Sequence, residues 1–387
     1  MLMRFSLLFA TLTCFLAVPQ ARAEDQSNSP SSSPSTFQLS PNTPSRAKNT
    51  HTAKFKVDFR VAVTAPAKTK VLKVWLPLPM TDNAQRVSNR TLESLPRQVT
   101  PQIGTEPIHG NTFAYFEFHN PSGAQLIEHK FEALIDQQVF DLDYAAVTKP
   151  DSWPTSFEAY QRPDPRTKEG GQLREVLDEI NQSESDVDRL VGAMQWVDQN
   201  LTYDHVQASL SANPMHALTH RRGHCSDYHG LCSTLARNVG YPSRVLYGLQ
   251  MFDKGSPSHC KLDVFLPPYG WVPFDLSETQ KMVLKVAADE TKSADQRDSI
   301  RKKIKDRSMQ GFRENTWLKV TQGVNYQLMP PAANPVTIVR TIYAEADGIA
   351  LPEPDPSNPE QSTFSWMTIH RVDEIGNASR KFSEIED

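Results

Sequence analysis

The sequence has 387 residues, enough for about two to three domains with buried cores, and its formal net charge at pH 7 is −4. This small negative charge gives no overall attraction to nucleic acid or to anionic lipid. The sequence contains no phosphate-cradling glycine-rich loop, no dinucleotide fingerprint and no internal repeat. These features argue against nucleotide-binding, nucleic-acid-binding and repeat proteins.

Residues 1–23 have the pattern of a secretory signal peptide. Arg4 precedes an apolar run over residues 5–18, and Ala21-Arg22-Ala23 provides a small-residue cleavage site. The run is shorter than the ~20 apolar residues that span a bilayer, and no later stretch is apolar enough to do so. We therefore expect a soluble, exported chain without an integral membrane segment, located in the periplasm or outside the cell.

Residues 24–50 are rich in Ser, Pro, Asn and Thr and bury too little apolar surface to offset the entropy of ordering, so we expect an unstructured tether. Apolar and polar residues then alternate over residues 55–63, as in a half-buried strand. Further strands are expected over residues 71–76, 113–118 and 126–135. We interpret residues 51–145 as an antiparallel β-sandwich domain and residues 146–170 as an interdomain linker.

Two helices are predicted next, over residues 173–180 and 187–197, because apolar residues recur there with a period of about 3.6. Ser183 or Ser185 is the expected N-cap of the second helix. Asp186 and Asp188 follow in its first turn, where the helix dipole favours acidic side chains.

The following helix is expected to begin at a cysteine. Gly223 is a helix breaker directly before His224 and Cys225, an apolar stripe then extends to Val239, and Gly240 ends the pattern. In the first turn, unpaired backbone N–H groups and the positive end of the dipole favour a thiolate over a thiol. The same N–H groups can hold the oxyanion of a tetrahedral intermediate.

A histidine opens the strand that follows, and an aspartate ends the next strand. Period-2 alternation places Cys260 and Leu262 on a core face and His259 and Lys261 on the opposite face. The same test turns Asp275 away from the apolar face of its strand, so His259 and Asp275 can share one face of a hairpin. A cysteine, a histidine and an aspartate in this order are the parts of a thiol nucleophile, its base and the group that orients the base.

These residues resemble the transglutaminase-like superfamily, including its secreted bacterial members. The resemblance covers about residues 185–330 and rests on a helix around Trp196 and on four ordered segments: Gly223-His224-Cys225, Gly240-Tyr241-Pro242-Ser243-Arg244, His259 and Gly270-Trp271-Val272-Pro273-Phe274-Asp275. It implies an α+β fold in which a papain-like transglutaminase core, a cysteine-carrying helix packed on an antiparallel sheet, follows the β-sandwich. We assign this core to residues 170–330.

The resemblance also implies that Cys225, His259 and Asp275 form a catalytic triad. In one respect the chain departs from the pattern: many members have an aromatic residue two positions after the histidine, where this chain has Lys261. The departure alters the surroundings of the acyl pocket and leaves the triad intact.

Cleavage of the signal peptide would leave three cysteines, an odd number that predicts at least one free thiol. Cys225 and Cys232 are seven residues apart on one helix, so ~10 Å separates their Cα atoms, which is too far for a disulfide. Cys232 falls on the apolar stripe and Cys260 on the core face of its strand. We therefore expect both to be packed, inert thiols.

A metal site is the main competing interpretation, because several histidines lie near the cysteines. The chain has neither a Cys-x-x-Cys nor a His-Glu-x-x-His pair, so we expect no metal and no cofactor. His224 and His229 are interpreted as helix-flanking residues. Asp227, the acid that competes with Asp275, is interpreted as a helix cap.

The remaining third of the chain offers no further chemistry. Residues 285–310 alternate in charge and predict a solvated helix or loop rather than a partner-binding arm. Strands are expected over residues 317–320, 324–329, 336–343 and 364–372. The alternation leaves open whether residues 331–387 complete the catalytic sheet or form a small separate β module.

The sequence thus predicts an exported cysteine enzyme that attacks amide or peptide carbonyls of a peptide or protein through a thioester. Water is the default acceptor, and no dry amine channel can be identified, so hydrolysis by a peptidase, amidase or deamidase is favoured over transamidation. A non-catalytic scaffold or binding protein with the same fold is the alternative from another class, but such a protein would not need all three polar residues. The natural substrate and the oligomeric state are not predicted.

Overall fold

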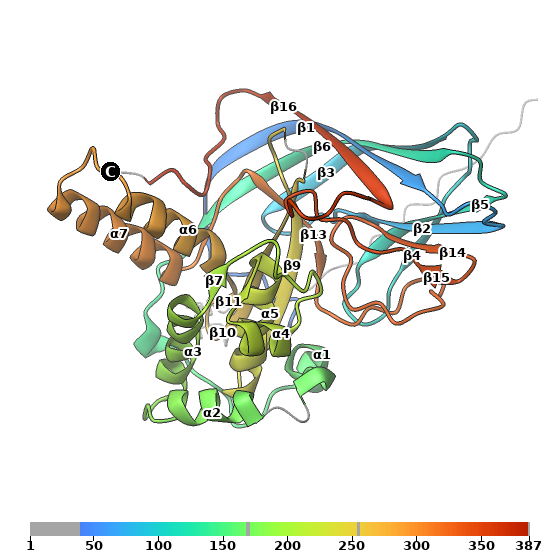
Figure 1. The fold of residues 1–387 in the computed structure, drawn as a ribbon. Helices are drawn as coiled ribbons and strands as arrows, with labels where there is room; N and C mark the ends of the chain where they lie inside the picture. The colour runs from blue at the N-terminus through green and yellow to red at the C-terminus, as the bar shows by residue number, and fades with distance from the viewer. Residues whose placement is uncertain (1–38, 168–170, 254–255, 386–387) are drawn as a thin grey trace, which may run out of the picture. The chain divides into compact units, whose positions relative to one another are not determined.

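The computed structural model describes residues 39–167, 171–253 and 256–385. The signal peptide predicted over residues 1–23 and the first part of the Ser/Pro-rich segment lie outside these described residues. Within the described residues, two sheets form a sandwich and a third sheet is accompanied by helices (Figure 1). No helix of the described residues is long and apolar enough to cross a membrane.

The first sheet of the sandwich has the strand order β12-β6-β1-β16, and β3 also pairs with β6. Its strands are β1 (Lys48–Thr64), β3 (Gln85–Leu95), β6 (Ala124–Val139), β12 (Phe312–Arg313) and β16 (Trp366–Ile375). The long antiparallel pair of β1 and β6 aligns Phe59 with His129. Alternate residues of β1 from Phe55 to Val63 are buried, as the sequence pattern predicts.

The second sheet has the order β15-β14-β2-β5-β4. Its strands are β2 (Val71–Leu78), β4 (Gln102–Thr105), β5 (Thr112–His119), β14 (Tyr343–Ala346) and β15 (Ile349–Ala350). Phe59 of the first sheet and Val74 and Phe116 of the second belong to one hydrophobic core. The inner faces of the two sheets therefore pack against each other as a β-sandwich.

Both ends of the chain build this sandwich, which corrects the predicted boundaries of residues 51–145 and 331–387. β16 pairs with β1 and β14 pairs with β2, so the C-terminal strands neither complete the catalytic sheet nor form a separate module. Without them the edges of β1 and β2 would be open to pairing with other chains. Trp366 of β16 also fills the shared core. β1 begins at Lys48, inside the segment expected to be unstructured.

Two of the expected strands are wrong. Residues 324–329 and most of residues 336–343 form loops, joined by a single bridge between Tyr326 and Val336. These residues are apolar because Tyr326, Leu328 and Val336 pack on Trp75 in a satellite core, not because they pair in a sheet. The described part of the linker expected over residues 146–170 is likewise packed at Phe157, whose ring centroid lies 4.7 Å from that of Phe265.

The third sheet is antiparallel, with the order β11-β10-β9-β13. Its strands are β9 (Ser243–Gln250), β10 (Ser258–Leu266), β11 (Gly270–Phe274) and β13 (Trp317–Gln322). The helices of this half are α1 (Glu158–Gln161), α2 (Gly171–Ile180), α3 (Asp186–Asn200), α4 (Pro214–His220), α5 (Cys225–Asn238), α6 (Leu276–Ala287) and α7 (Ala294–Met309). A short parallel pair, β7 (Thr202–Tyr203) with β8 (Arg222–Gly223), precedes α5.

The packing of α5 on this sheet gives the predicted α+β core. Leu231 and Leu235 of α5 share a hydrophobic core with Leu262 and Val264 of β10. From β9 and β13, Leu249 and Leu318 instead reach into the core of the sandwich. The cysteine-carrying helix is thus held on a sheet that is itself anchored to the sandwich.

The helix signals in the sequence are confirmed. α2 and α3 lie over the predicted residues, and Ser185 caps α3 by accepting a hydrogen bond from the Asp188 N–H. Gly240 has φ +97°, a conformation in which a residue with a Cβ is strained, and it follows the last turn of α5.

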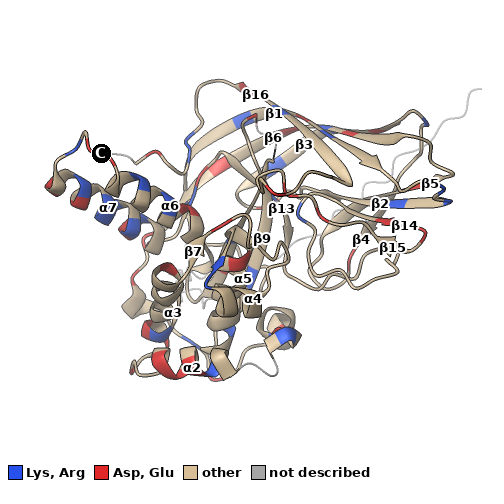
Figure 2. Ribbon diagram, viewed as in Figure 1, with Lys and Arg blue, Asp and Glu red and all other residues tan. Residues whose placement is uncertain are grey.

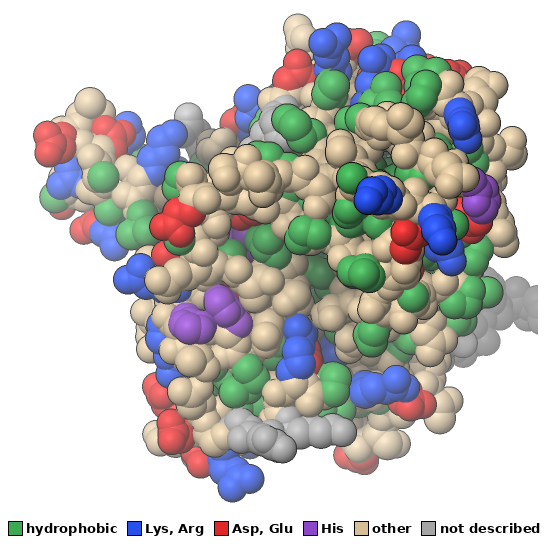
Figure 3. Space-filling model, turned by 45° about the vertical axis from the view of Figure 1, so that its right-hand side comes forward, with side chains coloured by type: hydrophobic (Ala, Val, Ile, Leu, Met, Phe, Trp, Pro, Cys, Tyr) green, Lys and Arg blue, Asp and Glu red, His purple; other side chains and the backbone are tan. Residues whose placement is uncertain are grey.

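Most of the alternating charges of residues 285–310 lie along the solvated helix α7, of which only Ile304 and Ser308 are buried, and the first of them lie at the end of α6 and in the loop between the two helices (Figure 2). On the face shown in Figure 3, hydrophobic side chains are scattered among polar and charged ones. That face therefore carries no single extended apolar patch.

Candidate active site

Cys225 is the first residue of α5, and the turn before it is tightly built. His224 is the N-cap: its Nδ1 accepts a hydrogen bond from the Ser226 N–H at 3.1 Å, and the Asp227 carboxylate accepts from the His224 N–H at 3.2 Å. This reciprocal arrangement confirms Asp227 as a cap. Gly223 has φ +154°, and a Cβ there would lie 2.3 Å from Asp227 Oδ2. A glycine is therefore needed for Asp227 to reach back and cap the helix.

Cys225 lines a pocket of about 220 Å³, although the residue is only 5% exposed. Its side chain is a hydrogen-bond partner of His259 and of Cys260. The backbone N–H groups of the first helical turn have no partner within the helix and point toward its N-terminal end. The thiol is thus buried among polar groups without being sealed off from the pocket.

The structure brings His259 and Asp275 together as the strand pattern predicts. His259, in β10, places Nε2 2.6 Å from Asp275 Oδ2. Asp275 directly follows β11 and caps α6, because its Oδ1 accepts a hydrogen bond from the Glu278 N–H at 3.0 Å. Since Nε2 is engaged with Asp275, Nδ1 is the ring nitrogen that remains for the thiol of Cys225. The three side chains therefore lie in the order thiol, imidazole, carboxylate.

Lys261 reaches the same carboxylate. Its side chain is fully buried, and Nζ lies 2.7 Å from Asp275 Oδ2 and 3.0 Å from Glu314 Oε2. Lys261 and His259 alternate with the core residues of β10, so both project from the same face of the strand. Two cationic partners hold one oxygen of Asp275, which fixes the carboxylate and keeps it charged.

His229 and Cys260 form a second set of contacts near the Cys225 thiol. The Leu276 N–H donates to His229 Nε2 at 3.2 Å, so the ring proton of neutral His229 is on Nδ1. Nδ1 lies 3.4 Å from Cys260 Sγ and donates to it, which leaves the Cys260 S–H to donate to Cys225. Contacts thus extend from the backbone of α6 through His229 to Cys260, which packs against Cys225.

This second set of contacts was not predicted from the sequence. Cys260 is a packed thiol, as expected, but it is not inert, because it contacts Cys225. His229 lies inside α5 and is fully buried, rather than flanking the helix. The available signal was its spacing: four residues separate Cys225 from His229, which puts both on one face of a helix.

The charges of these groups favour a thiolate beside an imidazolium. The hydrogen bond from Cys260 lowers the pKa of Cys225 well below its ordinary value; burial opposes this, and the charge of His259 supports it. Burial acts against a charged His259, but the charges of Asp275 and Cys225 raise its pKa to about 9. Burial acts against a charged Asp275 too, yet Lys261 and His259 hold its pKa well below the usual range. His259 supplies the positive charge near Cys225, because burial lowers the pKa of His224.

The pocket around Cys225 and His259 is lined mostly by polar side chains, which come from several parts of the chain. Tyr203 and His205 precede α5, and Glu278 and Lys281 belong to α6. The C-terminal part of the chain contributes Arg340, Asp355 and Ser357. These C-terminal residues could not be assigned to the pocket from the sequence, because they are brought there by the strands of the sandwich. No group of three or more His, Cys, Asp or Glu side chains in the described residues is arranged to hold a metal ion.

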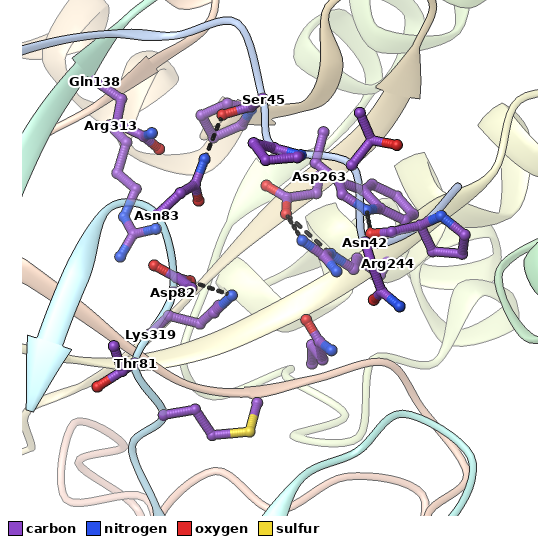
Figure 4. Close-up of a pocket in the computed structure, with 17 residues that line it drawn as sticks. Asn42, Ser45, Thr81, Asp82, Asn83, Gln138, Arg244, Asp263, Arg313 and Lys319 are labelled. Carbon is purple, nitrogen blue, oxygen red and sulfur yellow. Dashed lines mark hydrogen bonds and ion pairs between the residues drawn. The ribbon is translucent and has the colours of Figure 1, made fainter. Parts of the chain in front are cut away.

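A separate cavity of about 350 Å³ shares none of its lining residues with this pocket (Figure 4). Its cations each have a bonded partner. Arg244 donates from Nε and Nη2 to Asp263 at 2.9 and 2.8 Å. Lys319 Nζ lies 2.5 Å from Asp82 Oδ2, and Arg313 Nη2 donates to Gln85 Oε1 at 2.6 Å. Because Asp82 and Gln85 come from the sandwich, we interpret this network as a structural junction.

Comparison with known proteins shows what this part of the chain is similar to. A family profile described as the transglutaminase-like superfamily matches residues 174–276, which include Cys225, His259 and Asp275. A solved structure described as a candidate cysteine protease from Cytophaga hutchinsonii superposes with a TM-score of 0.56. It is 12% identical in sequence and covers 86% of this chain and 93% of its own.

Residues 174–276 belong to the transglutaminase-like superfamily. The likeness to the Cytophaga hutchinsonii structure shows that the fold of this chain, with the transglutaminase-like core and its sandwich, has a solved counterpart. The α+β fold predicted from the sequence is therefore confirmed.

Two further similar proteins match a smaller part of the chain. An uncharacterized protein of Haemophilus influenzae is 26% identical over 158 residues, which is 35% of this chain and 41% of that protein. The chain thus spans less than half the length of this curated relative. The periplasmic domain of TgpA from Pseudomonas aeruginosa is 14% identical and covers 58% of this chain and 88% of its own, with a TM-score of 0.26.

Proposed function

We propose that this protein is an exported cysteine enzyme that hydrolyses amide bonds of peptides or proteins through a thioester. The observation that carries the proposal is the buried array of Cys225, His259 and Asp275, which opens on a polar pocket at the N-terminal end of α5. Export rests on the signal-peptide pattern of the first 23 residues.

The first half of the reaction starts from the thiolate–imidazolium pair. The Cys225 thiolate attacks the substrate carbonyl carbon and a tetrahedral intermediate forms. Its oxyanion accepts a hydrogen bond from the Cys225 N–H and lies at the positive end of α5. His259 then donates its proton to the leaving nitrogen, the carbon–nitrogen bond breaks, and ammonia or an amine departs. A thioester to Cys225 remains.

The second half regenerates the enzyme. Neutral His259 takes a proton from water, which attacks the thioester carbonyl, and the carbon–sulfur bond breaks to release the acid and the thiolate. Asp275 keeps the imidazole in one orientation throughout and stabilises its charged form. The polar lining of the pocket supports water as the acceptor. Among the residues that line it, only Tyr203 and Phe252 have large, mostly apolar side chains.

The proposal is tested by mass analysis of the products. The purified chain is incubated with a glutamine-containing peptide library, with and without an amine donor, beside Cys225→Ala. Hydrolysis of peptide bonds or deamidation of glutamine by the wild type alone would support the proposal. Incorporation of the amine into the peptide would show that the enzyme transamidates its substrate rather than hydrolysing it. A Cys225 that alkylates no faster than a free thiol, with no product, would indicate a scaffold instead.

A further inference from the structure

Arg340 is a buried cation beside the candidate nucleophile, and the proposed reaction gives it no role. It lies between β13 and β14, and its carbonyl oxygen accepts a hydrogen bond from Ser258 Oγ at 3.0 Å. This contact holds Arg340 next to the residue that precedes His259. Its side chain lines the same pocket as Cys225 and is only 8% exposed.

The guanidinium of Arg340 has a long ion pair with Glu353 and one nitrogen without a hydrogen bond to any described residue. Nη1 lies 3.8 Å from Glu353 Oε1, beyond hydrogen-bonding distance, and has no hydrogen-bond partner among the described residues. Burial raises the pKa of Glu353 to about 7, so this neighbour carries only part of a negative charge at neutral pH. A buried guanidinium in this state gains free energy when an anion binds it.

The charges around Arg340 differ in how they are paired. Lys281 Nζ lies 2.6 Å from Glu278 Oε2 and His259 is bonded to Asp275, whereas His205 Nδ1 and Asp355 Oδ2, 3.5 Å apart, have no hydrogen-bond partner among the described residues. Unlike Lys281 and His259, Arg340 thus lines this pocket with a cationic nitrogen, Nη1, that has no hydrogen-bond partner among the described residues.

A second hydrogen-bond donor lines the same pocket. His224 Nδ1 accepts from the Ser226 N–H, and burial keeps the ring neutral, so the proton is on Nε2. His224 Nε2 is buried and has no hydrogen-bond partner among the residues described. Two unpartnered donors beside one nucleophile match a ligand group that only accepts hydrogen bonds.

We propose that Arg340, assisted by His224, binds a carboxylate of the substrate close to the amide bond that Cys225 attacks. A planar guanidinium can donate two parallel hydrogen bonds to a carboxylate, which an ammonium cannot do. The inference rests on the proposed function and narrows it to peptides with a free carboxylate near the scissile bond. That carboxylate is either the end of a peptide chain or the side chain of Asp or Glu.

A pair of alkylating reagents tests this without knowledge of the substrate. Iodoacetate carries a carboxylate, and iodoacetamide is its neutral counterpart of nearly the same size. The rate of Cys225 modification by each is measured by peptide mass spectrometry, and the ratio is compared with that of N-acetylcysteine at the same pH. We expect the ratio of iodoacetate to iodoacetamide to be at least about tenfold higher for Cys225. Arg340→Met should bring it toward the free-thiol value.

Arg86→Met is the matched control, because Arg86 is exposed on β3 in the sandwich. It should keep the wild-type ratio. If Cys225 reacts readily but shows no preference for iodoacetate, and Arg340→Met changes nothing, the carboxylate site is overturned while the proposed function stands. If Cys225 reacts no faster than a free thiol with either reagent, the proposed function itself fails.

Protection experiments distinguish the two sources of the carboxylate. N-acetylalanine offers only an α-carboxylate, and the α-amide of N-acetylglutamate offers only a side-chain carboxylate. Each is compared with its fully amidated form as a protector of wild-type Cys225 against iodoacetamide. Protection by the first indicates a chain end and protection by the second an acidic side chain. Equal protection by acids and amides overturns the proposal.

A conservative variant covers the case in which Arg340→Met does not fold. Arg340→Lys keeps the charge but loses the planar fork, so it should weaken protection by the preferred carboxylate about tenfold. Protection as strong as in the wild type would contradict a bidentate carboxylate site.

Discussion

Two polar cavities among the described residues, the larger one in Figure 4 and the smaller pocket beside Cys225, differ in whether a reactive thiol lies among their polar groups. In the larger cavity, Arg244 and Lys319 are bonded to Asp263 and Asp82. In the smaller pocket beside Cys225, buried donors of Arg340 and His224 have no hydrogen-bond partner among the described residues. Cavity size therefore does not identify the reactive site. Buried polar atoms without a hydrogen-bond partner occur in both, since Arg313 Nε and Gln322 Oε1 belong to residues that line the larger cavity. The thiol with a lowered pKa, which of these two cavities only the smaller one contains, is what marks it as the candidate reactive site.

The largest effect on hydrolysis is expected for His259, which lines the pocket beside Cys225 and not the larger cavity. His259→Gln removes the proton donor and the cation beside the thiolate, while the larger cavity keeps all of its contacts. We expect the hydrolysis rate to fall by roughly 10²- to 10⁴-fold, the usual contribution of a positioned acid–base group. The rate is measured with the best peptide from the product screen. A loss of less than fivefold would contradict the role given to His259.

Two buried lysines, Lys261 beside Asp275 and Lys319 in the larger cavity, test whether the two polar networks are separate. Lys261→Met leaves Glu314 without its cation and Asp275 with His259 alone, and Lys319→Met leaves Asp82 without its bonded lysine. Lys261→Met should lower the free energy of unfolding by about 3–5 kcal/mol, as for the loss of one partner of a buried ion pair. Urea denaturation measures this cost in both variants. Only Lys261→Met should also slow the alkylation of Cys225; equal slowing by Lys319→Met would show that the two networks are not separate.

The pH dependence of hydrolysis follows from the raised pKa of His259. The imidazolium that protonates the leaving group is lost as the pH rises through about 9, so the rate should fall above that pH. The same shift stabilises the fold. Since the pKa of an unfolded histidine is ~6.5, this stabilisation is complete below that pH and is lost as the pH rises through about 9. A rate that is already falling at pH 7 would contradict the raised pKa.

The smallest effect concerns the thiol that donates to Cys225. Cys260→Ala removes this donor, so the pKa of Cys225 should rise and its alkylation at pH 6 should slow by up to about tenfold. Cys232→Ala is the control, because Cys232 is equally buried in the core between α5 and its neighbours. Equal rates in the two variants would mean that Cys260 only packs.

Much of this fold could be predicted from local signals. The cap at Ser185, the helix start at Cys225 and the turn at Gly240 each depend on residues within one or two turns of the position. Period-2 alternation also predicted that His259 and Asp275 meet, because a strand fixes the face of each side chain.

The features that were missed depend on contacts between distant segments. Nothing near Tyr343 or Trp366 in the sequence indicates that their strands pair with β2 and β1. For the same reason Arg340 could not be placed beside Cys225, and Cys260 was interpreted only as a core residue. Its contact with Cys225 depends on how α5 is set on β10, which periodicity does not describe.

The most direct test of the account is the titration of Cys225 itself. The rate of its alkylation by iodoacetamide is measured from pH 4 to pH 10 by peptide mass spectrometry in the wild type and in His259→Gln. We predict half-maximal reactivity well below the ~8.5 of an ordinary cysteine in the wild type, and a shift toward that value in the variant. A wild-type midpoint at or above ~8.5 would contradict the thiolate–imidazolium pair.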